Sequence, residues 1–357
     1  QGFTYTRLGN PNLEQLAGKI AILEGIDLLR RSTGLPPKEC VAGMVFSSGM
    51  AAISSAILAL IGKGQTIVTH PSLYGATFTL FRALEADYGI NIHFTKGLSL
   101  QDWEEALESA GQVDLVYVET PSNPVLSLVD LEGVAQLAHA HSAWMMVDNT
   151  FASPYCQRPL TLGADVVVHS TTKYLCGHGL VIGGAVVSRH PEFVHTRLAS
   201  RNAILGGVPS PFDCWLAAIG LKTFELRMRA HCENALRLAE FLEAHPRVDR
   251  VYYPGLKSHP DADLARKQMF APGGMIAFEL KGGYEAGVAL LNRVKVATLA
   301  VSLGNTDTLV SHPASMSQVN VPAEIRRQTG VSDGLIRLSV GIENIEDLVA
   351  DFDQAIL

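Results

Sequence analysis

Several patterns that would point to other kinds of protein are missing from this sequence. The longest apolar run, around residues 51–61, is too short to cross a membrane and contains two serines, so no membrane span is expected. The five cysteines are odd in number and form no Cys-x-x-Cys pair, which argues against a disulfide framework and favours the reducing cytoplasm. No basic run occurs and the net charge is −7, so nucleic acid is not expected as a partner.

Two common cofactor signatures are also absent. The 12 histidines include no His-Glu-x-x-His motif, so we expect no metal site. The glycines of residues 177–184 follow a lysine and do not open a helix after the first strand, so they do not match a dinucleotide fingerprint. No signal peptide is visible, and because the sequence starts at Gln1 without a Met, we expect that an N-terminal piece precedes it.

The composition predicts a large folded core. Hydrophobic residues make up 47% of the 357 residues and charged residues 18%, which suits one large domain and a smaller one. Short apolar segments alternate with helical patterns, which predicts an α/β fold with a mostly parallel central sheet and helices on both faces. We expect strands at 65–69, 91–95, 114–119, 143–147, 165–169 and 180–187, with helices at 13–30, 51–60, 74–86, 100–109 and 131–141.

The ends of the chain have different patterns. Residues 1–12 are rich in turn formers and read as an extended arm, followed by an α/β domain over 13–220. A long helical pattern over 210–245, broken near Gly220, predicts a link to a C-terminal α+β domain within 221–357. There we expect strands at 275–280 and 335–340, and helices at 284–293 and 345–356.

An acid and an amine follow two of the expected strands. Asp148 and Lys173 come directly after apolar segments that read as buried parallel strands, and ligands bind at the carboxyl ends of such strands. A lysine flanked by hydroxyls, with an acid one strand away, suits pyridoxal phosphate. The amine bonds the aldehyde of this cofactor, and the acid keeps the ring nitrogen protonated. Ser170 and Thr172 can bond the phosphate. The alternative is that Asp148 caps a turn and Lys173 is a solvated surface amine.

Other side chains are expected at the same edge. Ser48 and Gly49 precede a helix, whose free N–H groups offer an anion site, although an ordinary cap looks the same. Tyr74 follows a strand and can stack on a planar ring or pack at the rim. Asn123 lies in a turn with two prolines, where it binds a ligand or only forms the turn. Arg337 lies inside an apolar strand and needs an anionic partner, either an acidic side chain or a substrate carboxylate.

These residues stand in motifs that resemble one known family. The chain is similar over nearly its whole length to the γ-subfamily of fold-type-I pyridoxal-phosphate enzymes, the Cys/Met metabolism or trans-sulfuration family. The matching motifs are Tyr-Thr-Arg-Leu-Gly-Asn-Pro (5–11), Ser-Ser-Gly-Met-Ala-Ala (47–52), Glu-Thr-Pro-Ser-Asn-Pro (119–124), Val-Asp-Asn-Thr-Phe (147–151), His-Ser-Thr-Thr-Lys-Tyr (169–174) and Arg-Leu-Ser-Val-Gly (337–341).

The resemblance implies a role for each of these residues. Lys173 would carry the cofactor and act as the base, Asp148 would pair with the ring nitrogen, and Tyr74 would stack on the ring and donate a proton to the leaving sulfur. The resemblance also implies a homotetramer built from dimers, in which the arm of one subunit completes a neighbour's site. The implied phosphate contacts are Ser48, Gly49, Met50, Ser170 and Thr172, with Tyr5 and Arg7 from the neighbour; the implied substrate contacts are Asn123, Ser302 and Arg337.

The substrate is harder to infer. Val301 stands where relatives that handle cystathionine tend to have a Glu, and it suits an apolar thioether; several segments also resemble methionine γ-lyases. Ala76 replaces their usual Cys, and Asn202-Ala203 replaces their Lys-Asp pair, so the parts disagree. We expect methionine γ-elimination first, giving methanethiol, 2-oxobutanoate and ammonia. Cystathionine γ-lyase, cystathionine γ-synthase or O-acetylhomoserine sulfhydrylase activity comes next, and a catalytically silent α/β binding protein is the alternative of a different class.

Overall fold

The computed structural model describes residues 2–32, 34–316, 324, 326 and 330–356. Its larger sheet has seven strands in the order β1-β7-β6-β5-β4-β2-β3. Neighbours among β2 to β6 run parallel, whereas β7 runs antiparallel to both β1 and β6, so the expected mostly parallel sheet is confirmed. The strands are β1 (Ala42–Phe46), β2 (Thr66–Thr69), β3 (Asn91–Phe94), β4 (Leu115–Glu119), β5 (Trp144–Asp148), β6 (Val166–Ser170) and β7 (Gly184–Ser188).

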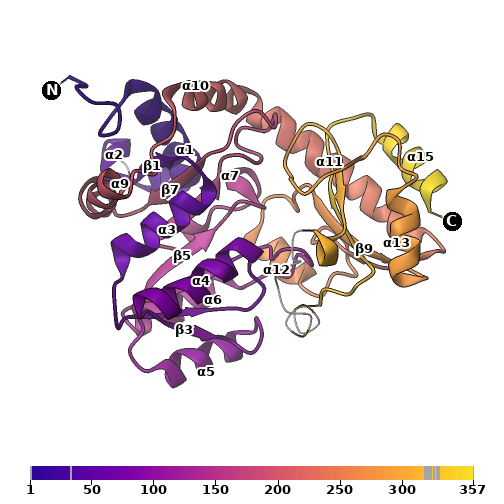
Figure 1. Cartoon of the computed structure of the whole chain (residues 1–357), viewed down its shortest axis with the longest axis horizontal. Helices are drawn as coiled ribbons and strands as arrows, with labels where there is room; N and C mark the ends of the chain where they lie inside the picture. Colours follow the sequence, from indigo (N-terminus) through magenta and orange to yellow (C-terminus); the bar gives the residue numbers. More distant parts are fainter. Residues whose placement is uncertain (1, 33, 317–323, 325, 327–329, 357) are drawn as a thin grey trace.

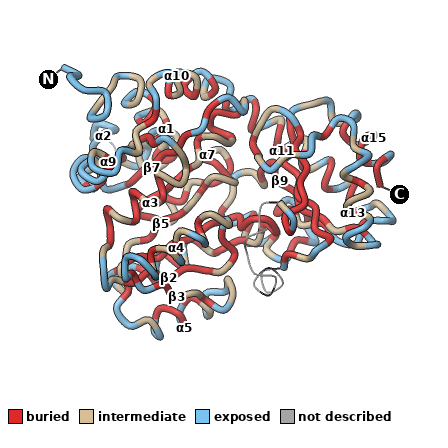
Figure 2. Tube along the Cα trace, viewed as in Figure 1, coloured by how far each residue is buried: buried red, intermediate tan, exposed pale blue. Residues whose placement is uncertain are grey.

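Helices cover this sheet, and the layers can be followed in Figure 1. The central strands are buried along their length, as the continuous apolar runs predict for a sheet covered on both faces; Figure 2 shows them as a buried interior inside a more exposed shell. The helices are α1 (Pro11–Arg31), α2 (Pro37–Cys40), α3 (Gly49–Leu60), α4 (Gly75–Tyr88), α5 (Leu100–Ala110), α6 (Leu131–Ala140), α7 (Ser153–Cys156), α8 (Pro191–Phe193), α9 (Ala199–Leu205) and α10 (Pro211–Gly220), with a 3-10 turn at Pro159–Leu162 and a π-helical turn at Val194–Leu198.

A second, smaller sheet follows the long helical segment. The expected break near Gly220 is a 3-10 turn, Leu221–Thr223, after which α11 (Phe224–Ala244) packs on the second sheet. This sheet has the order β10-β11-β12-β9-β8. Its elements are β8 (Val248–Tyr252), α12 (Ala262–Gln268), β9 (Met275–Leu280), α13 (Gly283–Leu291), β10 (Thr298–Leu299), β11 (Leu309–Ser311), a 3-10 turn (Pro313–Ser315), β12 (Leu335–Ser339) and α15 (Ile345–Ala355). The domain boundary after residue 220 stays a prediction.

Two sequence expectations about the N-terminal part were incomplete. The arm is shorter than 1–12, because α1 begins at Pro11: the Asn10 side chain caps it by accepting from the Asn12 N–H at 3.0 Å, and proline suits the first helical position. The strand β1 was not predicted. Its five residues include a glycine, and buried and less buried positions do not alternate regularly along it. It exists because it pairs in register with β7, which lies about 140 residues later in the chain.

No helix within the described ranges is both long enough and apolar enough to span a bilayer.

Candidate active site

The carboxyl ends of β4, β5 and β6 open into a cavity of about 570 Å³. Its wall also contains segments from the second sheet, so residues separated by more than 280 positions meet there. Twelve of the residues singled out from the sequence line it: Ser48, Gly49, Met50, Tyr74, Asn123, Asp148, Ser170, Thr172, Lys173, Val301, Ser302 and Arg337.

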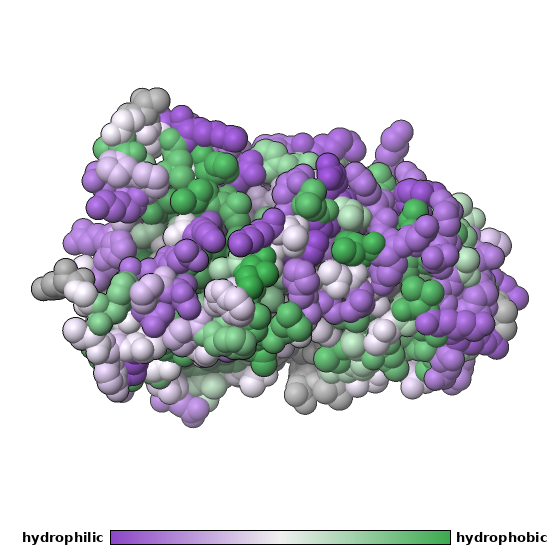
Figure 3. Space-filling model, turned by 90° about the horizontal axis from the view of Figure 1, so that it is seen from above, coloured by the Kyte–Doolittle hydropathy of each residue, from purple (hydrophilic) through white to green (hydrophobic). Residues whose placement is uncertain are grey.

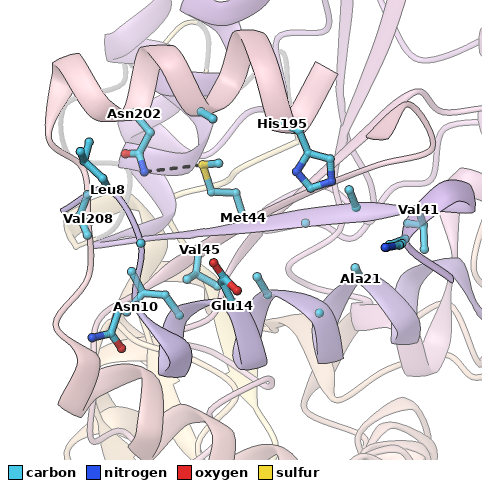
Figure 4. A pocket seen from close by; sticks show the side chains of 18 of the residues that line it. Leu8, Asn10, Glu14, Ala21, Val41, Met44, Val45, His195, Asn202 and Val208 are labelled. Carbon is cyan, nitrogen blue, oxygen red and sulfur yellow. Dashed lines mark hydrogen bonds between the residues drawn. The ribbon is translucent and has the colours of Figure 1, made fainter. Parts of the chain in front are cut away.

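Two of the predicted residues lie elsewhere. Tyr5 and Arg7 are in the exposed arm, and the Arg7 guanidinium donates to the Ala203 carbonyl at the end of α9. Arg7 lines a different cavity of about 610 Å³ between the arm, α1, β1 and α9; Figure 4 shows Asn202 there with its amide directed at the Met44 sulfur. The structure therefore does not bring Tyr5 and Arg7 to the active-site cavity of their own chain.

The start of α3 forms one wall of the cavity. Ser48 caps the helix by accepting from the Ala51 N–H at 3.0 Å, which leaves the first N–H groups at the positive helix end directed away from the helix body. Gly49 approaches β6 so closely that a Cβ there would lie 2.8 Å from the Cβ of Ser170. This backbone cradle beside a serine hydroxyl suits a phosphate group.

The hydroxyl of Thr172 is less available than expected. It donates to the Gly183 carbonyl at 3.2 Å and accepts from the Gly183 N–H at 3.0 Å. One lone pair remains on this oxygen, so donation to a phosphate requires the hydroxyl to leave the carbonyl. Of the two predicted hydroxyls, Ser170 is the better placed to donate.

Asp148 is the last residue of β5, and its carboxyl faces the cavity. The Thr150 N–H donates to Oδ1 at 2.9 Å. Burial raises the pKa of this carboxyl, and the hydrogen bonds from Thr150 oppose that shift. The Thr150 hydroxyl oxygen also accepts from the Ser170 N–H at 2.9 Å, joining the ends of β5 and β6. Sequence reasoning missed Thr150; its place two residues after Asp148 is the pattern of an Asx turn and was the available signal.

Lys173 extends into the cavity from the turn after β6. Its Nζ donates to the Ser302 hydroxyl at 3.2 Å, which connects the larger sheet to the segment before β11. Burial, with a smaller contribution from the positive charge of Arg337, lowers the pKa of the Lys173 amine to about 8. The amine is therefore far more often neutral, and nucleophilic, near neutral pH than a surface lysine.

Arg337 is buried in β12, and its partners are uncharged. Its guanidinium donates to the Asn123 side-chain oxygen at 3.2 Å and to the carbonyls of Val301 and Ser302 at 2.8 and 3.3 Å. Within the part of the chain that the structure describes, no carboxylate forms a salt bridge with it. Burial lowers its pKa to about 10. Of the two partners expected from the sequence, an acidic side chain is not found there among the described residues, and the substrate carboxylate stays a prediction.

Tyr74 and Glu119 are in contact in the cavity wall. Tyr74 directly precedes α4, its side chain is 44% exposed, and its N–H donates to Glu119 Oε2 at 2.6 Å. Glu119 ends β4 and also lines the cavity. Sequence reasoning treated it only as part of a turn, although its position at a strand end was the same signal that singled out Asp148.

Much of the cavity lining is apolar. The following lining residues were also missed, because an apolar residue in a helix or a loop carries no local sign that it faces a ligand: Ile53, Pro121, Phe151, Ile182, Leu303 and Met316.

A model of one protein family, described as Cys/Met metabolism PLP-dependent enzyme, matches residues 1–357. The chain belongs to this family. The cofactor of this protein is therefore pyridoxal phosphate (PLP). The protein is a PLP-dependent lyase of the trans-sulfuration type, and its architecture is fold type I.

Named relatives in this family are similar over almost the whole chain. An L-methionine gamma-lyase of Fusobacterium nucleatum is 46% identical over 356 residues, which cover 99% of this chain and 86% of the relative. A cystathionine gamma-lyase of Sus scrofa is 41% identical over an alignment that covers 99% of this chain and 84% of the relative. Among solved structures, a cystathionine gamma synthase of Xanthomonas oryzae pv. oryzae in complex with aminoacrylate and cysteine superposes with a TM-score of 0.93 at 41% identity, covering 100% of this chain and 88% of that one.

The cavity of this family member has the features that the cofactor requires. It has an amine with a lowered pKa in Lys173, a half-buried acid one strand away in Asp148, and a helix start at Gly49 that approaches closely enough to cradle a phosphate. Its volume is within the usual range for a small-molecule site. The residues present therefore fit pyridoxal phosphate.

Proposed function

We propose that this protein is an L-methionine γ-lyase that converts methionine and water into methanethiol, 2-oxobutanoate and ammonia. The observation that carries the proposal is the distribution of charge in the cavity. Its ionisable lining residues other than Tyr74 are Glu119, Asp148, Lys173 and Arg337. The other lining residues within the described ranges are uncharged, so they offer no carboxylate for a second amino group, which an apolar thioether lacks and cystathionine has.

Arg337 provides the fixed point for the substrate. Its planar guanidinium is held by Asn123 and two backbone carbonyls, and its remaining N–H donors can take the α-carboxylate. The side chain of the amino acid then extends toward Val301, whose exposed side chain stands at the mouth beside Ile182. This orientation places the sulfur among apolar groups.

The proton transfers are assigned to two side chains. Bound pyridoxal phosphate supplies the electron sink, and Asp148 maintains it by holding the proton of the ring nitrogen. The Lys173 amine, neutral above its lowered pKa, would accept the proton of Cα and, once it has released that proton, the proton of Cβ; Ser302 orients it. The Tyr74 hydroxyl gives a proton to the leaving sulfur. The phosphate is bound by the α3 start (Ser48, Gly49 and Met50) with Ser170 and Thr172.

We also propose a homotetramer built from dimers, with sites shared between subunits. Tyr5 and Arg7 lie outside the cavity of their own chain, which supports their serving a neighbour's phosphate. The surface beside the arm is unusually apolar: Phe212, Trp215 and Ile219 recur along one face of α10 and are all exposed. Figure 3 looks onto this side and shows hydrophobic side chains among hydrophilic ones. The five free cysteines support a reducing compartment, the cytoplasm.

The test is a product assay with three substrates offered separately: methionine, cystathionine, and O-acetylhomoserine with sulfide. We expect methanethiol and 2-oxobutanoate from methionine, with a kcat/KM at least about tenfold above that for cystathionine, because burying an unpaired ammonium is costly. Val301→Glu should reverse this order, and Leu180→Glu, an exposed change outside the cavity lining, should not. Turnover of cystathionine alone would refute the proposal.

A second candidate, cystathionine γ-lyase or synthase, is supported by particular residues. Ala76 and Asn202-Ala203 differ from the residues usual in methionine γ-lyases, and the segment 201–215 is more like that of cystathionine enzymes. The same assay identifies a lyase, which would cleave cystathionine into cysteine, 2-oxobutanoate and ammonia. A synthase would form cystathionine when cysteine replaces sulfide beside O-acetylhomoserine. An O-acetylhomoserine sulfhydrylase would give homocysteine from the third substrate pair.

A further inference from the structure

Glu119 is a second buried acid in the cavity and has no role in the mechanism above. It ends β4 beside the end of β5, and its Cα is in register with that of Asp148. Adjacent parallel strands lie about 4.8 Å apart, and paired residues point to the same face of the sheet. Glu119 is only 6% exposed. Two carboxyl groups, one buried and one half-buried, therefore lie side by side at the edge where the cofactor is proposed to bind.

The hydrogen bonds of Glu119 connect it to uncharged partners. Oε2 accepts from the Tyr74 N–H at 2.6 Å, and the Tyr117 hydroxyl lies 3.1 Å from Oε1 and donates to it. The backbone N–H of Glu119 donates to Nε2 of His70 at 3.0 Å. No lysine, arginine or histidine in the described ranges forms a salt bridge with this carboxyl. A buried carboxylate without a cation is unfavourable, which favours the protonated form.

The groups that face Glu119 from neighbouring elements agree with this. Asp148 on β5 carries a charge of the same sign. Tyr74, Thr77 of α4 and Tyr117 of β4 supply only hydrogen bonds. Burial lowers the pKa of His70 to about 4, so this ring is neutral. Burial first, and the charge of Asp148 second, raise the pKa of Glu119 to about 8; the hydrogen bonds oppose the shift and are weaker.

The contact with Tyr74 gives the carboxyl a task. Tyr74 stands at the start of α4, where its side chain makes no capping hydrogen bond. Glu119 therefore holds the backbone of the residue whose ring is proposed to cover the cofactor. Tyr117, packed edge-on against Phe81 of α4, supports the same helix, with ring centroids 5.1 Å apart.

We propose that Glu119 is a positioning residue that holds Tyr74 in place in its uncharged form, and that the carboxylate charge of the site is thereby left to Asp148. The inference rests on the proposed cofactor site, not on the identity of the amino-acid substrate. An ionised Glu119 would compete with Asp148 for the proton of the ring nitrogen, and an uncharged Glu119 does not.

The test compares three variants of the full chain. Glu119→Ala removes the acceptor for the Tyr74 N–H. It should weaken pyridoxal phosphate binding and lower kcat, each by about tenfold or more, because a buried donor left without an acceptor costs about that much. Glu119→Gln keeps the acceptor without the charge and should recover most of both losses. Glu104→Gln, an exposed change on α5, is the matched control.

A second measurement does not depend on any substrate. A carboxyl whose pKa is raised on folding stabilises the fold fully below its unfolded pKa, and that contribution is lost as the pH rises through the folded pKa. With the cofactor removed, Glu119→Gln should therefore gain at least about 2 °C in unfolding midpoint relative to wild type between about pH 5 and about pH 9. Glu119→Gln being as impaired as Glu119→Ala, or a midpoint difference that does not change with pH, would overturn the proposal. Failure to cleave methionine would instead bear on the proposed function alone.

Discussion

At the scale of single residues, the site works through burial. Lys173, Arg337 and Glu119 carry groups whose ordinary pKa values would make all three charged at neutral pH. Burial raises the pKa of the acid and lowers those of the two bases, because in each case it disfavours the charged form. Arg337 stays charged since its pKa remains far above 7, whereas Lys173 and Glu119 reach values near 8. The same physical effect thus leaves Arg337 as a cation that can bind a carboxylate, and Lys173 as an amine that can accept a proton.

The lysine can be tested by the pH dependence of cofactor loading. Only the neutral Lys173 amine can bond the aldehyde, so the rate of reconstitution with pyridoxal phosphate should rise with pH and reach half its maximum near pH 8. Arg337→Gln removes a neighbouring positive charge and should move this midpoint upward, while Arg250→Gln, an exposed change on β8, should leave it in place. A wild-type midpoint near 10.5, the ordinary value for lysine, would contradict the assignment.

At the scale of elements, the site depends on how closely one helix approaches one strand. The start of α3 lies against the end of β6, and glycine at residue 49 permits the approach. A second close approach occurs at Gly304, where φ is +72° and an added Cβ would lie 2.6 Å from the backbone nitrogen of Tyr174. Both glycines bring a loop or helix end to the segment 170–174, which carries the lysine. The position of Lys173 is thus set by close contacts from the start of α3 and from the loop at Gly304.

Gly49→Ala tests the helix approach. The new Cβ would lie 2.8 Å from that of Ser170, so α3 or β6 must shift, and overpacking of this kind costs about 1–3 kcal/mol. We expect the affinity for pyridoxal phosphate to fall by about tenfold, measured by equilibrium titration. Gly18→Ala is the control, because its Cβ would have no neighbour within 4 Å on α1. Equal affinity in Gly49→Ala and wild type would mean that this helix start does not hold the phosphate.

At the scale of the whole molecule, the arm and the cavity lie apart within one chain. Arg7 contacts the end of α9, and the exposed apolar face of α10 lies on the same side. A shared site between two copies accounts for both observations, because a two-fold interface places the same surface of each subunit against its mate.

Mixed oligomers test this arrangement. Arg7→Ala and Lys173→Ala should each be nearly inactive alone. In a dimer containing one of each, the site with an intact Lys173 receives an intact Arg7 from the other subunit, so unfolding and refolding the two variants together should restore about a quarter of wild-type activity. If Arg7 serves its own chain, the mixture gains nothing. Lys173→Ala mixed with itself is the control.

The local sequence determined much of this protein. Continuous apolar runs placed β4, β5 and β6 in a buried parallel sheet, and the acid and the amine that follow two of them had to lie at its carboxyl edge, because side-chain type and chain direction decide that outcome within a few residues. The motifs around Lys173 and Arg337 likewise predicted the family and its cofactor from short segments.

Only the tertiary structure decided the remaining features. The strands β1 and β11 have no clear local pattern, and they form because residues far away in the chain pair with them. Glu119 became part of the site through its register with Asp148, and the uncharged environment of Arg337 arose from loops that precede it by more than 30 residues. Register, burial and the resulting pKa values depend on what lies across a contact in space, and a one-dimensional pattern does not contain that information.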